Sequence, residues 1–197
     1  MGLDLVHDIQ KAYRQVLDSM SQPGKINTIH EQAMKNSLEI RCFPSTIVLI
    51  QMLLDTEIKF KVCSKHEKEW VKLINQLTYA QVSNADEADF ILILNDAEKK
   101  DAEMALKMAS IGNLQNPQCG ATFIIEASSL NSGQELKITG PGIMTEQLIK
   151  VDTFENLMDL RAEKNAEYPL GIDLILIDSQ DHVLCLPRTT LIEQVVR

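Results

Sequence analysis

The stretch "GIDLILIDSQDHVLCLPRTT" (residues 171–190) decides the fold that the sequence predicts. Two apolar runs flank the polar segment "DSQDH", which is the pattern of two β-strands joined by a tight turn. Asp173 stands inside the first run, and the second run stops at Pro187, just before Arg188, Thr189 and Thr190. Because an unpaired carboxylate in an apolar strand is costly, Asp173 is expected to be exposed, protonated or paired.

The register of this hairpin supplies a partner for Asp173. If the turn has two residues, the antiparallel ladder places Asp173 opposite Arg188. One interpretation is a structural ion pair at the end of the sheet. The other is an anion site made by Arg188, Thr189 and Thr190 at an open end of the sheet, because a guanidinium beside two hydroxyls is a good donor set.

The composition indicates a soluble globular protein. Of the 197 residues, 45% are hydrophobic and 24% are charged, which suits one domain over residues 1–197. The formal net charge is -9, and without a basic stripe the chain is not expected to bind nucleic acid. No apolar run has the length of a signal or membrane-spanning segment, so a cytoplasmic location and no membrane partner are expected.

The thiols and imidazoles give no sign of a metal or cofactor site. The four cysteines are scattered, none forms a Cys-x-x-Cys pair, and they are expected to be reduced thiols, mostly in the core. The four histidines also lack the spacing of metal ligands. The sequence therefore predicts neither a metal nor a bound cofactor.

Hydrophobic periodicity predicts an α/β fold with a mixed β-sheet flanked by helices. The expected helices are residues 4–21, 46–54, a helix opened by a capping box of Ser64 and Glu67, 97–110 and 153–166. The expected strands include residues 25–29, 57–63, 88–94 and 121–127. We further expect residues 121–127 to form a hairpin with 134–139, a short helix to follow Gly142, and the tail after Thr190 to be helical or irregular.

Two turns have the composition of ligand-binding loops. The segment "ITGPGI" (residues 138–143) fits a Gly-rich phosphate loop ahead of a helix, and it also fits a type II turn centred on Pro141 and Gly142. The segment "MSQPGK" (residues 20–25) fits a helix stop followed by a tight turn. Arg14 in that helix has Asp18 one turn further on, which indicates a surface ion pair.

Four stretches together resemble one protein family. They are "YRQVLDSMSQPGKI" (13–26), "GATFIIEASSLNSGQELKITGPGI" (120–143), "YPLGIDLIL" (168–176) and "LCLPRTT" (184–190). In this order and spacing they resemble the PhnH subunit of the bacterial carbon–phosphorus lyase system. Tyr13 and Tyr168 stand where Phe is expected, and residues 27–116 match the family poorly.

The resemblance implies a function in the use of alkylphosphonates as a phosphorus source. The family works with the G, I and L subunits to transfer the ribose triphosphate of ATP to methylphosphonate, with release of adenine. It also implies a fold like the α/β domain of pyridoxal-phosphate transferases without the cofactor, a homodimer, and a core complex with subunits G, I and J. The matching positions of interest are Arg14, Pro141, Gly142, Asp173, Arg188 and Thr189.

Two classes of function stay open on the sequence. The first is a non-catalytic or ligand-holding subunit of a multi-enzyme complex, with ATP or a phosphonate as candidate ligand. The second is a self-sufficient phosphate-ester or pyridoxal-phosphate-type enzyme, which would need a Schiff-base lysine. Most lysines lie on polar faces or in charge runs, and no nucleophile beside a base is recognisable. The catalytic residues stay unassigned, and the chain alone is expected to be inactive.

Overall fold

The computed structural model describes residues 3–36, 38 and 41–195. Its centre is a seven-stranded sheet of order β1-β9-β8-β5-β4-β2-β3. In chain order the strands of this sheet are β1 (Asn27–Thr28), β2 (Lys59–Cys63), β3 (Gln81–Val82), β4 (Phe90–Ile93), β5 (Thr122–Glu126), β8 (Asp173–Ile177) and β9 (His182–Leu186). All of these strands run in one direction except β9, so the predicted mixed sheet is confirmed.

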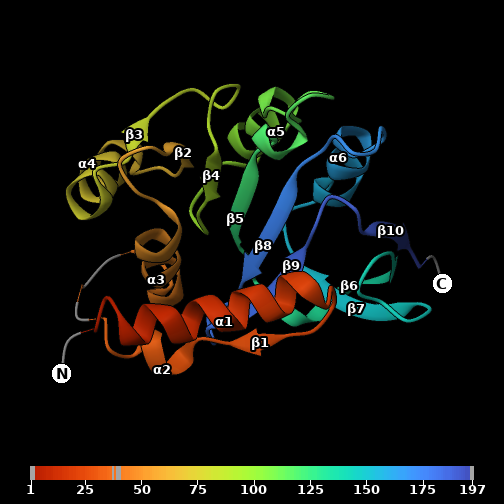
Figure 1. Cartoon of the computed structure of the whole chain (residues 1–197), viewed down its shortest axis with the longest axis horizontal. Coiled ribbons are helices and arrows are strands. Elements are labelled where there is room, and N and C mark those ends of the chain that lie inside the picture. Colours follow the sequence, from red (N-terminus) through yellow and green to blue (C-terminus); the bar gives the residue numbers. More distant parts are fainter. Residues whose placement is uncertain (1–2, 37, 39–40, 196–197) are drawn as a thin grey trace.

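Helices cover both faces of this sheet (Figure 1). They are α1 (His7–Ser21), α2 (His30–Ala33), α3 (Pro44–Leu53), α4 (Glu67–Thr78), α5 (Lys99–Met108) and α6 (Leu157–Lys164), with a short 3-10 turn at Pro117–Cys119. One core joins the sheet to α1, α3 and α4, and the other joins it to α5 and α6. The central strands serve both cores: Ile124 faces the first, whereas Phe123 and Ile125 face the second. Strands buried on both faces read as continuous apolar runs, as these do.

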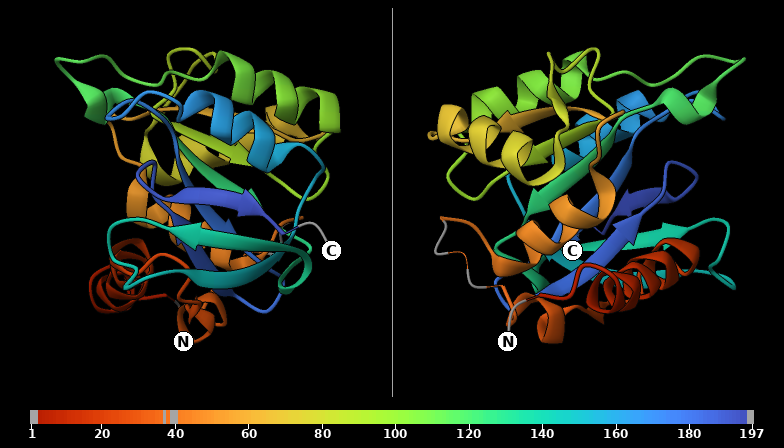
Figure 2. Two further views of the ribbon diagram at one scale, coloured as in Figure 1. Left: turned by 90° about the vertical axis from the view of Figure 1, so that its right-hand side faces the viewer. Right: turned by 60° about the vertical axis from the view of Figure 1, so that its left-hand side comes forward.

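A second, three-stranded sheet has the order β10-β6-β7. Its strands are β6 (Ser129–Thr139), β7 (Gln147–Asp152) and β10 (Leu191–Gln194). Both views in Figure 2 show this small sheet and α1 at one end of the molecule, away from α4 and α5. That residues 1–197 form one domain stays a prediction, although both cores share the large sheet.

Three expected elements are wrong, all around the second sheet. Residues 121–127 do not pair with 134–139, because β5 lies between β4 and β8 in the parallel sheet. Leu136 and Ile138 are buried while Glu135 and Lys137 are more exposed, the alternation of a strand in a one-sided outer sheet. The expected helix after Gly142 is the strand β7, and the tail after Thr190 is the strand β10.

The hairpin at residues 171–190 forms, but its register differs from the expected one. Leu174 pairs with Leu186 and Ile177 with Val183, so the loop is one residue longer than two residues allow. Asp181 has φ of 61°, and its amide donates to the carbonyl of Asp178 at 3.0 Å. A type I turn followed by one left-handed residue is the usual three-residue hairpin loop, and this loop moves the register by one.

Glycine turns fasten the second sheet to α1. Ile143 donates to the carbonyl of Gly140 at 3.1 Å, and Gly142 has φ of +84°, so residues 140–143 form the type II turn. A Cβ on Gly142 would lie 2.3 Å from the carbonyl oxygen of Ser21, at the end of α1. The side-chain amide of Gln147 donates to the carbonyl of Gly24 at 3.0 Å, in the neighbouring turn. The loop leads into β7 rather than a helix, so the helix amides of a phosphate loop are missing there.

Gly142→Ala should lower the free energy of unfolding by about 2–4 kcal/mol, since it adds a left-handed strain and a backbone clash. Urea denaturation measures the loss. Ser132→Ala, at an exposed position of β6, is the control and should change stability by less than about 0.5 kcal/mol. A Gly142→Ala protein as stable as the control would contradict the close packing of this turn.

Candidate functional site

The Asp173 and Arg188 side chains meet at the amino edge of the parallel strands. Asp173 is the first residue of β8, and Arg188 follows the end of β9. The guanidinium Nη2 is ion-paired with Oδ2 of Asp173, Nε lies 3.1 Å from the same oxygen, and the Arg188 amide donates to Oδ1 at 2.6 Å. The side chains are only 14% (Arg188) and 18% (Asp173) exposed. The predicted pairing is therefore confirmed, although the hairpin register that suggested it is wrong.

The guanidinium of Arg188 also donates hydrogen bonds to main-chain carbonyls inside the protein. Nη1 donates to the carbonyl of Pro117, and Nη2 lies 3.4 Å from the carbonyl of Gly120. Gly120 has no room for a side chain, because a Cβ would lie 2.2 Å from the carbonyl oxygen of Gly171. Arg188 thus ties β8, the end of β9 and the segment before β5 together. Anion binding by Arg188 stays a prediction, and it would require the guanidinium to release one of these partners.

The two threonines after Arg188 differ in their exposure to solvent. Thr189 is partly exposed, whereas Thr190 is 1% exposed and its buried hydroxyl has no hydrogen-bond partner among the described residues. The carbonyls of Pro187 and Thr190 accept from Nη2 and Nη1 of Arg161, at 2.6 and 3.1 Å. Burial lowers the pKa of Arg161 to about 10, and the charge of Asp173 opposes this shift. Arg161 therefore fixes residues 187–190 through hydrogen bonds to their main chain. Nothing in the sequence around Arg161 indicated this structural function.

Two other predicted site residues lie apart from the ion pair. Arg14 is exposed on α1, and Asp18 pairs with Lys25 at 2.8 Å instead of with Arg14. The expected Arg14–Asp18 pair is therefore wrong. Gly142 packs against the end of α1, and Pro141 is the exposed corner of the same turn. The structure brings together Asp173 and Arg188 with the start of the threonine loop, and it gives Gly142 a packing role.

The opposite, carboxyl edge of the parallel strands carries a row of polar residues. Ser64 follows β2, Asn95 and Asp96 follow β4, Glu126 ends β5, and Asp178 follows β8. In open α/β sheets, ligands bind outside the carboxyl ends of the strands, near the point where the strand order reverses. Here the order reverses between β2 and β4, since β3 lies on one side of this pair and β5 and β8 on the other.

Ser64 belongs to this row rather than to a capping box. Its hydroxyl donates to Oδ2 of Asp96 at 2.9 Å and accepts from the amide of His66 at 3.0 Å. Glu67, which the capping box requires to fold back, is instead paired with Lys61. The predicted capping box is therefore wrong, and its serine connects the ends of β2 and β4.

Glu126 is the most buried carboxylate at this edge whose partners are all uncharged. It is 8% exposed and accepts hydrogen bonds from the amides of Phe43 and Asn95, at 2.8 and 3.0 Å, and from the hydroxyl of Thr46. Desolvation raises the pKa of Glu126, while these hydrogen bonds oppose the shift. The carboxylate thereby fastens the start of α3 to the end of β5.

A cavity of about 280 Å³ opens beside Glu126. Its walls include the rings of Phe43 and Phe154, the ends of β4 and β5, and Lys99 at the start of α5. The ammonium of Lys99 is already bound to Glu155 at 2.6 Å, which raises its pKa. The cavity has a mixed polar and apolar wall with one buried carboxylate.

The sequence held a signal for this edge. Apolar strands ending abruptly in "ND" (residues 95 and 96) and "EAS" (residues 126–128) place polar groups at strand ends, where α/β proteins bind ligands. The residues predicted for the site lie instead in Gly-rich turns and beside Arg188. Phe43 and Phe154 come from distant loops, and sequence order alone does not bring them together.

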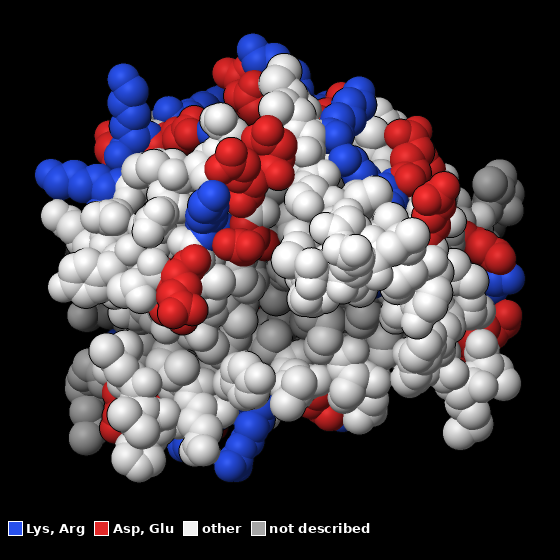
Figure 3. Space-filling model, turned by 45° about the horizontal axis from the view of Figure 1, so that its top comes forward, with Lys and Arg blue, Asp and Glu red and all other residues white. Residues whose placement is uncertain are grey.

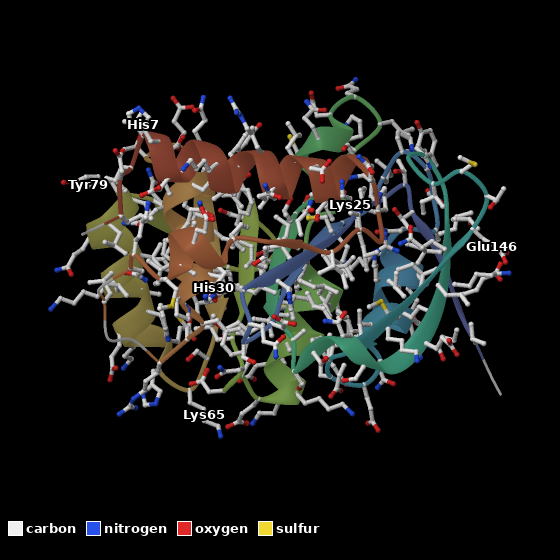
Figure 4. The ribbon with its side chains drawn as sticks, turned by 90° about the horizontal axis from the view of Figure 1, so that it is seen from below. His7, Lys25, His30, Lys65, Tyr79 and Glu146 are labelled. Carbon is white, nitrogen blue, oxygen red and sulfur yellow. The ribbon has the colours of Figure 1, made fainter. Side chains whose placement is uncertain are left out.

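The thiols are free, and they show no sign of activation. All four cysteines are free, and burial raises the pKa of Cys63 to about 11, which disfavours its thiolate. Cys119 is exposed, so it is no core thiol. Figure 4 shows His7 and His30 well separated on the lower face. No group of three metal-ligating side chains is found in the described parts of the chain.

The surface agrees with the acidic composition. On the face drawn in Figure 3, basic and acidic side chains are interspersed over the upper helices and form no broad basic patch among the residues shown. Within the residues that the structure describes, no helix is both long and apolar enough to cross a membrane.

Comparisons with known proteins give consistent matches over nearly the whole chain. The family model described as "Bacterial phosphonate metabolism protein (PhnH)" matches residues 3–193. A putative C-P lyase subunit protein, HtxG, of Stutzerimonas stutzeri is 29% identical over 185 residues, which cover 92% of this chain and 84% of that protein. The PhnH subunit of alpha-D-ribose 1-methylphosphonate 5-triphosphate synthase of Rhizobium meliloti (strain 1021) is 28% identical over 195 residues, covering 97% and 93%.

Asp173→Ala should reduce the free energy of unfolding by about 3–5 kcal/mol, because it leaves a largely buried guanidinium without its counter-ion. Glu87→Ala is the control, since it breaks an exposed ion pair with Lys59 and should cost less than about 1 kcal/mol. Chemical denaturation of both variants makes the comparison. Equal losses in the two variants would show that the Asp173–Arg188 pair contributes no more than a surface pair.

Proposed function

Because this chain belongs to the PhnH family of bacterial phosphonate metabolism proteins, we propose that it is a subunit of the carbon–phosphorus lyase system for alkylphosphonate catabolism. The observation that carries the proposal is the family match over residues 3–193, which includes all four stretches that first suggested it. The names of both relatives describe subunits, one of a C-P lyase and one of a synthase.

We propose that, with partner subunits, the chain supports transfer of the ribose triphosphate of ATP to methylphosphonate with release of adenine. The relative from Rhizobium meliloti supports this step, since its name is that of a subunit of the synthase that makes alpha-D-ribose 1-methylphosphonate 5-triphosphate. Expelling adenine requires help for the leaving base and for the developing charge on the sugar. We propose that the partners G, I and L supply the groups for both tasks.

A self-sufficient pyridoxal-phosphate-type or phosphate-ester enzyme is the second candidate. A Schiff-base lysine needs an amine that loses its proton easily. Lys99 lines the cavity beside Glu126, but its ion pair with Glu155 raises its pKa, which is the opposite effect. We therefore favour a fold like the pyridoxal-phosphate transferase domain without the cofactor, and the seven-stranded sheet between two layers of helices supports this proposal.

We propose a cytoplasmic homodimer that joins the core subunits G, I and J. Support for a dimer comes from α1 and the two residues before it, whose exposed side carries apolar residues. Those residues are Leu5, Val6, Tyr13 and Leu17, exposed by 50 to 71%. Contiguous exposed apolar residues of this kind often mark an interface.

Mixing the isolated chain with ATP and methylphosphonate should release no adenine above the enzyme-free background. Adding the partner subunits G, I and L should start the release, and omitting only this chain from the mixture should reduce it strongly. Chromatographic measurement of adenine follows the reaction. Adenine release by the chain alone would refute its dependence on partners, and full activity without it would refute its function as a subunit.

Leu17→Asp should convert the dimer to a monomer, because it places a charge in the apolar stripe on α1. Light scattering at micromolar concentration measures the mass. Lys11→Glu, exposed on another side of the same helix, is the matched control and should leave the dimer intact. A wild-type monomer, or a Leu17→Asp dimer, would contradict an interface on α1.

A further inference from the structure

The cavity at the carboxyl edge is bordered by one buried carboxyl group, Glu126, which no basic side chain of the described residues pairs with. Glu126 forms its wall and is 8% exposed. Within the described residues, no Lys, Arg or His nitrogen forms an ion pair with its carboxylate, and its hydrogen-bond donors are two amides and one hydroxyl. Buried carboxylates are usually paired with a cation or bound to a metal.

The geometry leaves Glu126 capacity for one more donor. Two oxygens of a carboxylate accept about four hydrogen bonds. Oε1 accepts from Phe43 and Thr46, whereas Oε2 accepts only from Asn95. A further donor would therefore find free acceptor capacity mainly on Oε2 rather than on Oε1.

The other walls favour an organic body over an inorganic ion. Phe43 and Phe154 supply rings, and Ala97 and Ala102 supply small apolar surfaces. Aromatic faces attract cations that carry apolar substituents. A divalent metal would need more ligands than the site has, since no group of three metal-ligating side chains occurs in the described residues.

The surrounding charges exclude an anionic ligand headgroup at Glu126. Lys99 is the cation on the cavity wall, and its ammonium is held by Glu155 at 2.6 Å with Glu103 at 4.0 Å. Asp96 lies near enough to disfavour the charge on Glu126, and its buried Oδ1 has no partner among the described residues. A positive charge in this cavity would be attracted by both carboxylates.

We infer that this cavity binds a small organic ammonium compound, with the ammonium on Oε2 of Glu126 and its apolar body between Phe43 and Phe154. Asn95, Ser128 and Thr153 on the same walls offer further acceptors for the other ammonium hydrogens. The inference rests on the cavity and its charges and does not depend on the family assignment.

Benzylammonium and benzyl alcohol test this inference as a matched pair, because they share one body and differ in charge. Titration calorimetry of the full-length protein should show saturable benzylammonium binding with Kd on the order of 1 mM or tighter, as a ligand of about eight non-hydrogen atoms can reach. Benzyl alcohol should bind at least about tenfold more weakly.

Variants separate the carboxylate from the apolar walls. Glu126→Gln should weaken benzylammonium at least about tenfold, and Phe154→Leu should weaken it several-fold without disturbing the start of α3. Asp152→Asn, an exposed carboxylate outside this cavity, should leave binding unchanged. If Glu126→Gln fails to fold, the inference is tested by comparing benzylammonium with benzyl alcohol on the wild-type and Phe154→Leu proteins. Equal binding of both probes, or no binding of benzylammonium up to about 10 mM, would overturn the inference.

Discussion

The ion pair between Asp173 and Arg188 closes the amino edge of the central sheet. Three segments from different parts of the chain meet at this guanidinium: the start of β8, the loop after β9, and the carbonyls before β5. Each partner is largely buried, so neither charge can lose the other without a large cost. The close contact of Gly120 with Gly171, which leaves no space for a side chain, is possible because this clamp holds the segments together.

The two edges of the parallel sheet therefore have different functions. At the amino edge, Arg188 and the two terminal nitrogens of Arg161 donate to internal acceptors, whereas the buried Nε of Arg161 has no hydrogen-bond partner among the described residues. At the carboxyl edge, Glu126 accepts only neutral donors and borders an open cavity. A fixed amino edge gives the strands a rigid frame, and sites built on rigid elements hold their groups more accurately than sites on loops. The polar row at the carboxyl edge is placed by that frame.

The sequence predicted a mixed sheet flanked by helices and the contact between Asp173 and Arg188, and it failed where one-sided strands occur. Continuous apolar runs such as residues 88–94 and 121–127 are recognisable as strands that must be covered on both faces, although the hairpin partner predicted for 121–127 is wrong. Residues 147–152 and 191–194 are short, and a few alternating residues do not distinguish a strand from a helix. The Asp173–Arg188 contact was predictable despite the wrong register, since a long guanidinium tolerates a shift of one residue. The hydrogen bonds of Arg188 to the main-chain carbonyls of Pro117 and Gly120 were not predictable, because they depend on how distant loops pack.

The turns that carry the family-specific motifs lie apart from the cavity, although Glu126 belongs to one of the stretches that resemble the family. The turns "SQPG" and "GPG" and the loop "PRTT" serve mainly close backbone packing: Gly142 lies against Ser21, Gly140 against Thr189, and Arg188 against Gly120. Glu126 comes from one of the four stretches that first suggested the family, whereas Phe43, Asn95 and Lys99 lie outside those stretches but within the residues 3–193 that the family model matches. The frame and the buried carboxylate are thus set by one part of the sequence and the shape of the cavity by another. Substitutions in the second part can change what the cavity accepts without loosening the sheet, because none of these wall residues contributes to the clamp at the amino edge.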